Sequence, residues 1–144
     1  MNKIHFKIIT PEKTVYESEI DQITLKVMDG EVTILPNHRS YVATLKAGEI
    51  ILKKEGKEIS LSTAGGFLEF DKNKLVILAD RAERAEEIDL KRAEEARIRA
   101  ENLKKEKISL DDEEYARIAA MIEKESARIK VAKKHHTRKG IKID

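Results

Sequence analysis

The feature that most constrains this chain is a change in the spacing of its apolar residues near Asp80. Before this point apolar and polar residues alternate, as they do from Ile4 to Ile8 and from Ile23 to Val27. Alternation places every second side chain on the same face of a β-strand. After Asp80 apolar residues recur every three or four positions, which is typical of an amphipathic helix. The pattern therefore predicts an α+β chain in which a β part precedes a helical part.

The β part is predicted to contain many short strands. Turn residues such as Pro11, Gly48 and the pair Gly65-Gly66 separate its apolar runs. Short strands at this spacing indicate an antiparallel sandwich or barrel, and about 80 residues can form a modest core of that kind. Besides the first two, strands are predicted at residues 31–35, 49–53, 58–62, 67–70 and 74–79.

The helical part contains no Pro and is rich in Ala, Glu, Lys and Arg, which are strong helix formers. A first helix is predicted to begin at Asp89, and a break is expected at residues 106–109. Asp111, with Glu114 three residues later, is predicted to cap a second helix. Two helices with a short link usually fold back as an antiparallel hairpin. The predicted inward-facing residues are Leu90, Ala93, Ala96, Ala100 and Leu103, then Tyr115, Ile118, Ile122 and Ile129.

The apolar stripe of the first helix is narrow and consists largely of alanine. Small side chains bury little area, and each buried Å² contributes only about 25 cal/mol. Isolated helices of this length are marginally stable in water. We therefore expect a weakly held hairpin that changes partners or conformation at a modest cost.

Composition excludes several classes of function. Charged residues make up 39% of the chain but the net charge is only +2, which indicates a mixed surface and not a single-sign field for nucleic acid. Aromatic residues make up 4% and Trp is absent, which argues against a base-stacking platform. The apolar runs are too short to span a bilayer, so direct membrane insertion is not predicted.

No catalytic or metal-binding motif is found, since the chain has no Cys, no glycine-rich phosphate loop and no H-E-x-x-H sequence. His135 and His136 are adjacent, and neighbouring helical side chains point about 100° apart, so they make a poor metal site. His5 is interpreted as a surface residue. His38, which follows the turn residues Pro36 and Asn37, is a candidate contact residue.

Four cations of the helical part are candidates for an anion-binding site. Arg92 follows Asp89 by three residues, and Arg99 lies two helical turns further along. Lys124 and Arg128 lie one turn apart on the second helix. In a closed hairpin these four cations can converge on one anion. The alternative is that the two arginines of the first helix pair with acids of that helix, each pair contributing about 0.2–0.5 kcal/mol.

A set of short motifs in the β part gives more specific information. They comprise Ile8, Thr10, Pro11, Val15, Tyr16, Gly30, Glu31, residues 34–38 and residues 65–69. With the order of β and helical parts, these motifs resemble the epsilon subunits of bacterial F-type ATP synthases over almost the full length. The family usually has Gly where this chain has Asn37, which also permits a turn. The resemblance implies a flattened antiparallel β-sandwich in residues 1–84 and an antiparallel two-helix hairpin in residues 85–144.

The resemblance also implies a role for the β-sandwich in the proton-translocating complex. It would bind the gamma subunit and the ring of c subunits within the central stalk of the rotor, and so couple rotation of the c-ring to ATP synthesis. Gly30, Glu31, Val32 and His38 match the family's region that faces the c-ring. The implied location is peripheral, at the cytoplasmic side of the cell membrane.

For the hairpin, the resemblance implies a regulatory element that either folds against the sandwich or extends into the catalytic alpha/beta head and inhibits ATP hydrolysis. From Arg128 to Lys142 the chain carries seven Lys and Arg residues and no acid. Such a run can meet an acidic surface of the head. The alternative interpretation is a solvated tail.

Some family members bind ATP in the folded hairpin through an I/L-D-x-x-R-A motif, which residues 88–93 match in full. ATP is thus expected as a regulatory ligand, no cofactor is required, and participation of Mg²⁺ is left open. Lys124 stands where the family has Arg, so it keeps the charge but loses the bidentate geometry. The ATP-binding residues implied by the resemblance are Glu83, Ile88, Asp89, Arg92, Ala93, Arg99, Lys124 and Arg128.

Two hypotheses of different classes result. The first is a non-catalytic coupling subunit whose hairpin is a brake sensitive to ATP. The second is a nucleic-acid-binding β-domain with a basic helical arm, but the predicted strands lack the aromatic and basic faces that such domains use.

Overall fold

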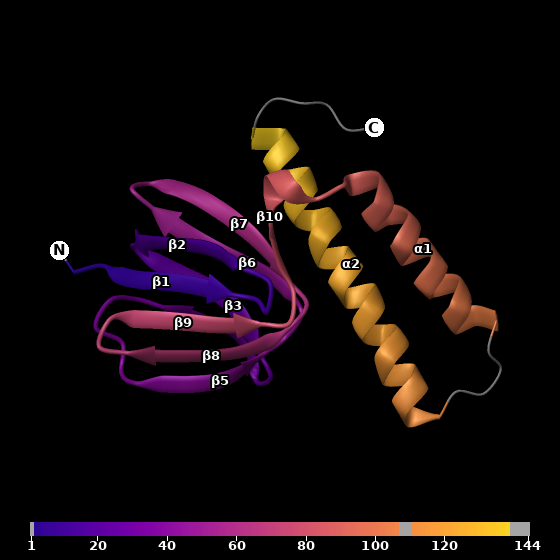
Figure 1. Ribbon diagram of the computed structural model, residues 1–144, viewed down its shortest axis with the longest axis horizontal. Helices are drawn as coiled ribbons and strands as arrows, with labels where there is room; N and C mark the ends of the chain where they lie inside the picture. The colour runs from indigo at the N-terminus through magenta and orange to yellow at the C-terminus, as the bar shows by residue number, and fades with distance from the viewer. Residues whose placement is uncertain (1, 107–110, 139–144) are drawn as a thin grey trace.

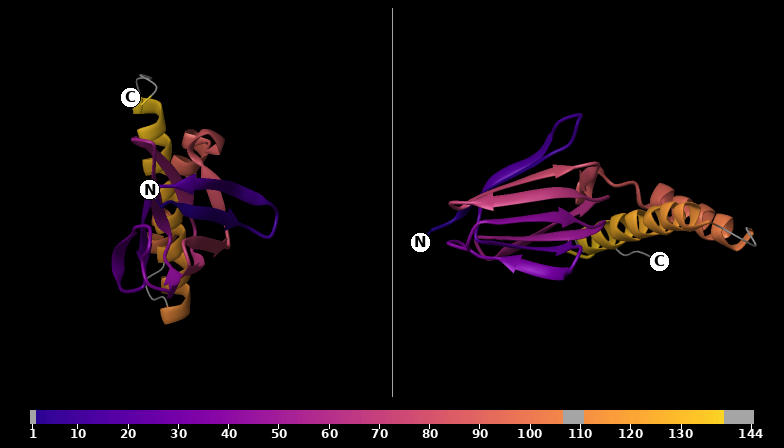
Figure 2. Two further views of the ribbon diagram at one scale, coloured as in Figure 1. Left: turned by 90° about the vertical axis from the view of Figure 1, so that its left-hand side faces the viewer. Right: turned by 90° about the horizontal axis from the view of Figure 1, so that it is seen from below.

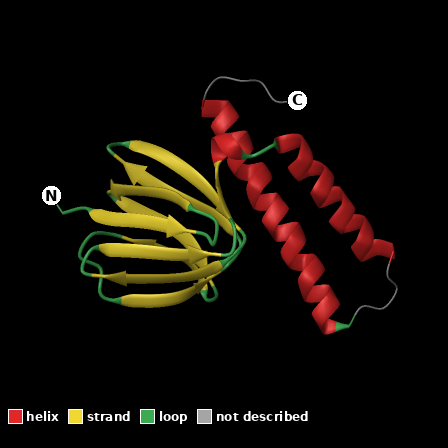
Figure 3. Cartoon of the chain, viewed as in Figure 1, coloured by secondary structure: helices red, strands yellow, loops and turns green. Residues whose placement is uncertain are grey.

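A computed structural model describes residues 2–106 and 111–138 of the chain. A β part is followed by a helical part (Figure 3), which confirms the predicted α+β class. A 3₁₀ turn, η1 (Ala85–Glu87), links the last strand to the helices α1 (Leu90–Glu106) and α2 (Asp112–Arg138). The strands are β1 (Ile4–Ile9), β2 (Thr14–Ile20), β3 (Gln22–Val27), β4 (Gly30–Ile34), β5 (Tyr41–Leu45), β6 (Gly48–Lys54), β7 (Lys57–Thr63), β8 (Gly66–Asp71), β9 (Lys74–Ala79) and β10 (Ala82–Arg84).

All ten strands belong to one hydrogen-bonded sheet, in the order β10-β7-β6-β3-β5-β8-β9-β1-β2, with β4 paired to β3. The sheet folds over itself into a sandwich that surrounds a single core. Sequence-adjacent strands such as β6 and β7 pair antiparallel, as predicted. The pair β1 and β9 is parallel, which the alternation did not anticipate. It joins the first strand to one of the last, and so ties the two ends of the β part together.

The core is built from the residues that alternation assigns to the inner face. Ile4, Phe6 and Ile8 of β1 are fully buried, while the residues between them are partly exposed. Phe6 and Phe70 are the largest fully buried side chains. Each such side chain contributes about 1.5–3 kcal/mol on burial. Every fully buried member of this cluster lies between Ile4 and Ala79, so the sandwich builds its core without the helices.

Both helices begin at the predicted aspartates. The Arg92 backbone N–H donates to Asp89 Oδ1 at 3.1 Å, and the Glu114 N–H donates to Asp111 Oδ1 at 2.7 Å. These bonds satisfy N–H groups that have no partner inside the helix. The predicted break at residues 106–109 falls largely on residues 107–110, which lie outside the described residues.

Helix α2 lies between α1 and the sandwich, and it packs on β6 and β7 (Figure 1). Two further views show the hairpin continuing from one end of the sandwich (Figure 2). Ile118 and Ile129 of α2 are buried as predicted, but Tyr115 is 50% exposed. The Lys104 ammonium of α1 instead lies over the Tyr115 ring, at 4.9 Å from the ring centroid. None of the helices in the described ranges is long and apolar enough to cross a membrane.

Candidate functional site

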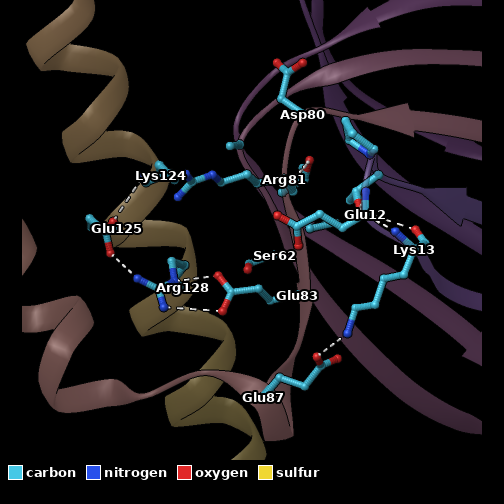
Figure 4. Close-up of a pocket in the computed structure, with 15 residues that line it drawn as sticks. Glu12, Lys13, Ser62, Asp80, Arg81, Glu83, Glu87, Lys124, Glu125 and Arg128 are labelled. Atoms are coloured by element: carbon cyan, nitrogen blue, oxygen red, sulfur yellow. Dashed lines mark hydrogen bonds and ion pairs between the residues drawn. The ribbon is translucent and has the colours of Figure 1, made fainter.

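A cavity of about 490 Å³ lies between α2 and the sandwich, and we call it the interface cavity. Its walls come from the turn between β1 and β2, the end of β7, the segment from β9 into β10 and one face of α2 (Figure 4). The lining residues are mostly charged or polar. This composition suits a polar or ionic ligand better than an apolar one.

Arg128 of α2 lies at the centre of an ion-pair network in this cavity (Figure 4). Its Nε is 2.6 Å from Oε1 of Glu83 on β10, and its Nη2 donates to Oε2 of the same carboxylate at 3.3 Å. Its Nη1 donates to Glu125 Oε2 at 2.7 Å. Burial lowers the pKa of the Arg128 guanidinium, but its hydrogen bonds to Glu125 and Glu83 outweigh burial, so the pKa lies above its ordinary value. The guanidinium therefore joins α2 to the last strand of the sandwich.

Lys124 lies one helical turn before Arg128 and also lines the interface cavity. Its Nζ is 3.4 Å from Oε1 of Glu125. Residues three and four apart lie on the same face of a helix, which explains why α2 presents both cations to one wall. Glu125 therefore contacts both of them.

A second contact joins α2 to the sandwich through Glu49 of β6, whose side chain is 4% exposed. The Lys134 ammonium is 2.9 Å from both carboxylate oxygens, and the Lys130 ammonium is 3.4 Å from Oε1. Burial raises the pKa of Glu49, but hydrogen bonds from Lys134 and Ser60 outweigh it, so the pKa lies below its ordinary value. This contact was not predicted, because Glu49 occupies an outward position that alternation assigns to solvent.

The rest of the surface beneath α2 is polar, with only a small apolar cluster. Ser60, Ser62 and Thr63 of β7 are buried together with Glu49. The apolar cluster consists of Ala85, Ile88, Val131 and Ala132, with Leu90 packed against it. Few large apolar side chains therefore hold the helix on the sandwich.

The structure places the predicted ATP-binding residues in three environments. Glu83, Lys124 and Arg128 line the interface cavity. Ile88 and Ala93 are buried, the former in the small apolar cluster. Asp89, Arg92 and Arg99 are exposed on or just before α1.

Arg92 and Arg99 of α1 are not among the residues that line the interface cavity with the cations of α2. The Arg92 side chain is 84% exposed, with its Nε 3.8 Å from Asp89 Oδ2. This is the intrahelical pair that the sequence left open as an alternative. The folded hairpin thus brings together two of the four predicted cations, and ATP binding stays a prediction.

The predicted c-ring residues lie at two turns. Gly30 follows a two-residue turn between β3 and β4, where its φ of +128° favours glycine, and the neighbouring Glu31 is exposed. Val32 is partly buried against the core. His38 is half-buried between the rings of Tyr41 and Phe70, at 5.8 Å from each centroid. Contact of these residues with a c-ring stays a prediction.

An exposed apolar surface covers the outer face of β5, β8 and β9. Phe67 is 61% exposed and pairs across the strands with Leu78, which is also exposed. Val42 of β5 and Val76 of β9 flank Glu69 on the same face. Contiguous apolar surface of this kind usually marks a protein interface.

His5 is a partly exposed residue that lies between two carboxylates. Its Nδ1 is 2.8 Å from Glu19 and its Nε2 is 2.8 Å from Glu17, and these hydrogen bonds, that to Glu19 first, raise the pKa of His5. His135 and His136 stand with ring centroids 6.1 Å apart. Within residues 2–106 and 111–138, no cluster of three or more His, Cys, Asp and Glu is placed to hold a metal ion.

Sequence relatives match most of the chain. A family model described as "ATP synthase, Delta/Epsilon chain, beta-sandwich domain" matches residues 3–85. The ATP synthase epsilon chain of Herpetosiphon aurantiacus is 38% identical over 135 residues, which are 94% of this chain and 98% of the relative. The epsilon chain of Desulforamulus reducens is 42% identical, over 87% of this chain and 93% of its own length.

Solved structures show the same fold at lower sequence identity. A chain in the cryo-EM structure of Euglena gracilis mitochondrial ATP synthase (OSCP/F1/c-ring, rotational state 1) superposes with a TM-score of 0.74 at 21% identity, covering 90% of this chain and 81% of its own. A chain from the central stalk and c-ring of the Tetrahymena thermophila mitochondrial enzyme gives a TM-score of 0.57 at 16% identity, with coverage of 93% and 96%.

Proposed function

This chain belongs to the ATP synthase epsilon chain family, and from that premise we propose that it is a non-catalytic subunit of the rotor's central stalk. Its sandwich is the part that docks on the rotor, at the cytoplasmic face of the membrane. Its hairpin is a regulatory part that inhibits ATP hydrolysis when it leaves the sandwich. This division into a docking sandwich and a regulatory hairpin is supported by the contact surface of α2. That surface is largely ionic and polar, and so suits reversible docking.

Two surfaces of the sandwich support the rotor role. The exposed apolar face around Phe67 and Leu78 is suited to the gamma subunit, because burying exposed apolar surface drives protein association. The turn at Gly30 to Val32, with His38 beyond it, is suited to the polar loops of the c-ring. Together these contacts would make the sandwich rotate with the c-ring, which is the coupling function.

The brake rests on the cations of α2. In the docked state Arg128 and Lys134 pair with Glu83 and Glu49 of the sandwich. When the hairpin extends, these same cations become free to meet acidic surface on the catalytic alpha/beta head. Docking to the sandwich and inhibition of the head therefore exclude each other.

ATP is proposed to favour the docked state. Its phosphates would bind among Lys124, Arg128 and the arginines of α1, and its binding would stabilise the folded hairpin by mass action. Reaching that geometry requires Arg92 to turn from its exposed position toward α2. A ligand shifts the balance only by its differential affinity for the two states. A fall in the concentration of ATP would then release the hairpin, and the released hairpin would slow ATP hydrolysis.

Co-purification tests the rotor role. With Phe67→Asp, recovery of the gamma subunit of the same complex is expected to fall by at least about tenfold, since a charge in a buried interface costs about 2 kcal/mol or more. The matched control is Tyr115→Asp, because Tyr115 is an exposed aromatic residue on α2. Equal recovery of gamma with both variants would contradict docking through the apolar face.

A further inference from the structure

Glu125 occupies the place where an anion would be expected to bind. It is 5% exposed, and it lines the interface cavity together with Lys124 and Arg128. Its Oε1 is 3.4 Å from the Lys124 ammonium, and its Oε2 accepts a hydrogen bond from Arg128 Nη1 at 2.7 Å. Both cations that α2 presents to the interface cavity are thus already neutralised by a carboxylate of their own helix.

The charge of the interface cavity as a whole is also unfavourable for an anion. Five carboxylates line it, against four cations. Like charges repel, so these carboxylates oppose the binding of a further anion. The carboxylates are Glu12, Asp80, Glu83, Glu87 and Glu125, and the cations are Lys13, Arg81, Lys124 and Arg128.

Glu125 differs from Glu83, the other acid on Arg128, in the element that carries it. Glu83 lies on β10, so its bond to Arg128 breaks when the helix leaves the sandwich. Glu125 lies three residues before Arg128 on α2 and therefore travels with both cations in either state. It competes with any external anion before and after docking.

We propose that Glu125 competes with the phosphates of ATP for Lys124 and Arg128, and that this competition sets the affinity of the hairpin for the nucleotide. This inference rests on the proposed function, in which ATP binds among these cations. The competing ligand class is a polyphosphate, whose oxygens would replace the Glu125 carboxylate on Lys124 and Arg128. The hairpin of this chain therefore responds to high and not to low concentrations of ATP.

The experiment is calorimetric titration of ATP, in buffer with EDTA, into the full chain and into Glu125→Gln. Gln keeps the shape and an oxygen acceptor for Arg128 but removes the charge. The variant is expected to bind ATP about tenfold more tightly, which corresponds to about 1.4 kcal/mol. The matched control is Glu101→Gln on α1, which removes a carboxylate 3.8 Å from Arg97 and outside the interface cavity, and it should bind like the original chain.

Two further variants separate the explanations. Arg92→Ala is expected to weaken ATP binding, since Arg92 belongs to the proposed site. Glu125→Asp keeps the charge and should keep the low affinity, so a gain equal to that of Glu125→Gln would overturn the competitor role. Far-ultraviolet circular dichroism of each variant checks that its helices are intact. If Glu125→Gln loses helical signal, Glu125→Asp is compared with the original chain in its place.

The outcomes distinguish this inference from the proposed function. If the original chain binds ATP and Glu125→Gln binds it equally or more weakly, the competitor role is wrong and the ATP sensor stands. If Arg92→Ala binds as the original chain does while Glu125→Gln binds ATP more tightly, the competitor role stands and ATP binds at the cations of α2 without Arg92. If no variant gives heat at millimolar ATP, both are wrong and the rotor role alone remains.

Discussion

At the scale of single residues, local contacts were predictable and distant ones were not. Asp89 and Asp111 cap helices as the sequence indicates, because a cap depends on residues within one turn. The pair of Glu83 with Arg128 spans 45 positions, and the contact of Glu49 with Lys134 spans 85. Whether an outward-facing acid meets water or a helix depends on how the hairpin docks, which alternation does not encode.

Glu49→Gln is expected to weaken docking of α2. The variant keeps the side-chain volume but loses charge-assisted hydrogen bonds to Lys134, a loss of about 1.5–3 kcal/mol at neutral pH. Faster hydrogen exchange of the α2 amides, with exchange in the sandwich unchanged, is the measurement. Glu69→Gln, on the outer face of β8, is the matched control. Equal exchange in the two variants would show that Glu49 does not hold the helix.

The same contact carries a pH dependence with a definite sign. Because the folded pKa of Glu49 lies below its ordinary value of 4.5, its contribution to docking is complete above that value. The contribution is lost as the pH falls through the lower, folded pKa. Protection of α2 in the original chain should therefore decrease more steeply on acidification than in Glu49→Gln, which lacks this titration.

At the scale of elements, apolar runs bounded by turn residues were correctly predicted as strands, whereas β2, β5 and β10 were missed. The runs that became β4, β6, β7, β8 and β9 were all expected. In β5 the outward Val42 is apolar and exposed, which hides the alternation, and β10 has only three residues. These strands owe their place to pairing with β8 and β7, which is a tertiary effect.

Docking of α2 as an element depends on its small apolar cluster as well as on ion pairs. Val131→Ala removes two methyl groups from a fully buried side chain and should weaken docking by about 1–2 kcal/mol. Increased hydrogen exchange in α2 would show this, whereas Ile98→Ala, at an exposed position of α1, should change little. Unchanged exchange in Val131→Ala would assign docking to the ion pairs alone.

At the scale of the whole molecule, the two parts differ in their ability to fold alone. The core of the sandwich is complete within residues 4–79. The hairpin has a seam of small side chains such as Ala93 and Ala100, and one face of α2 rests on the sandwich. The sandwich is therefore expected to be an independent folding unit, and the hairpin a conditional one.

Separate expression of residues 1–84 and 85–144 tests this expectation. The first piece should unfold cooperatively on heating, as followed by circular dichroism. The second should have less than half of the helical signal per residue that it has in the full chain, since isolated helices are marginal in water. Full helicity of the second piece on its own would contradict a hairpin that depends on the sandwich.

The polar surface beneath α2 has a consequence for solubility. When the helix leaves, β7 exposes Ser60 and Ser62, and β6 exposes Glu49, all of which water can hydrogen-bond. The small apolar cluster beside this surface adds Ile88, which lies between η1 and α1, as a large apolar side chain. The surface that the sandwich would uncover on undocking is therefore mostly polar, and this patch offers other copies of the chain little apolar area to adhere to.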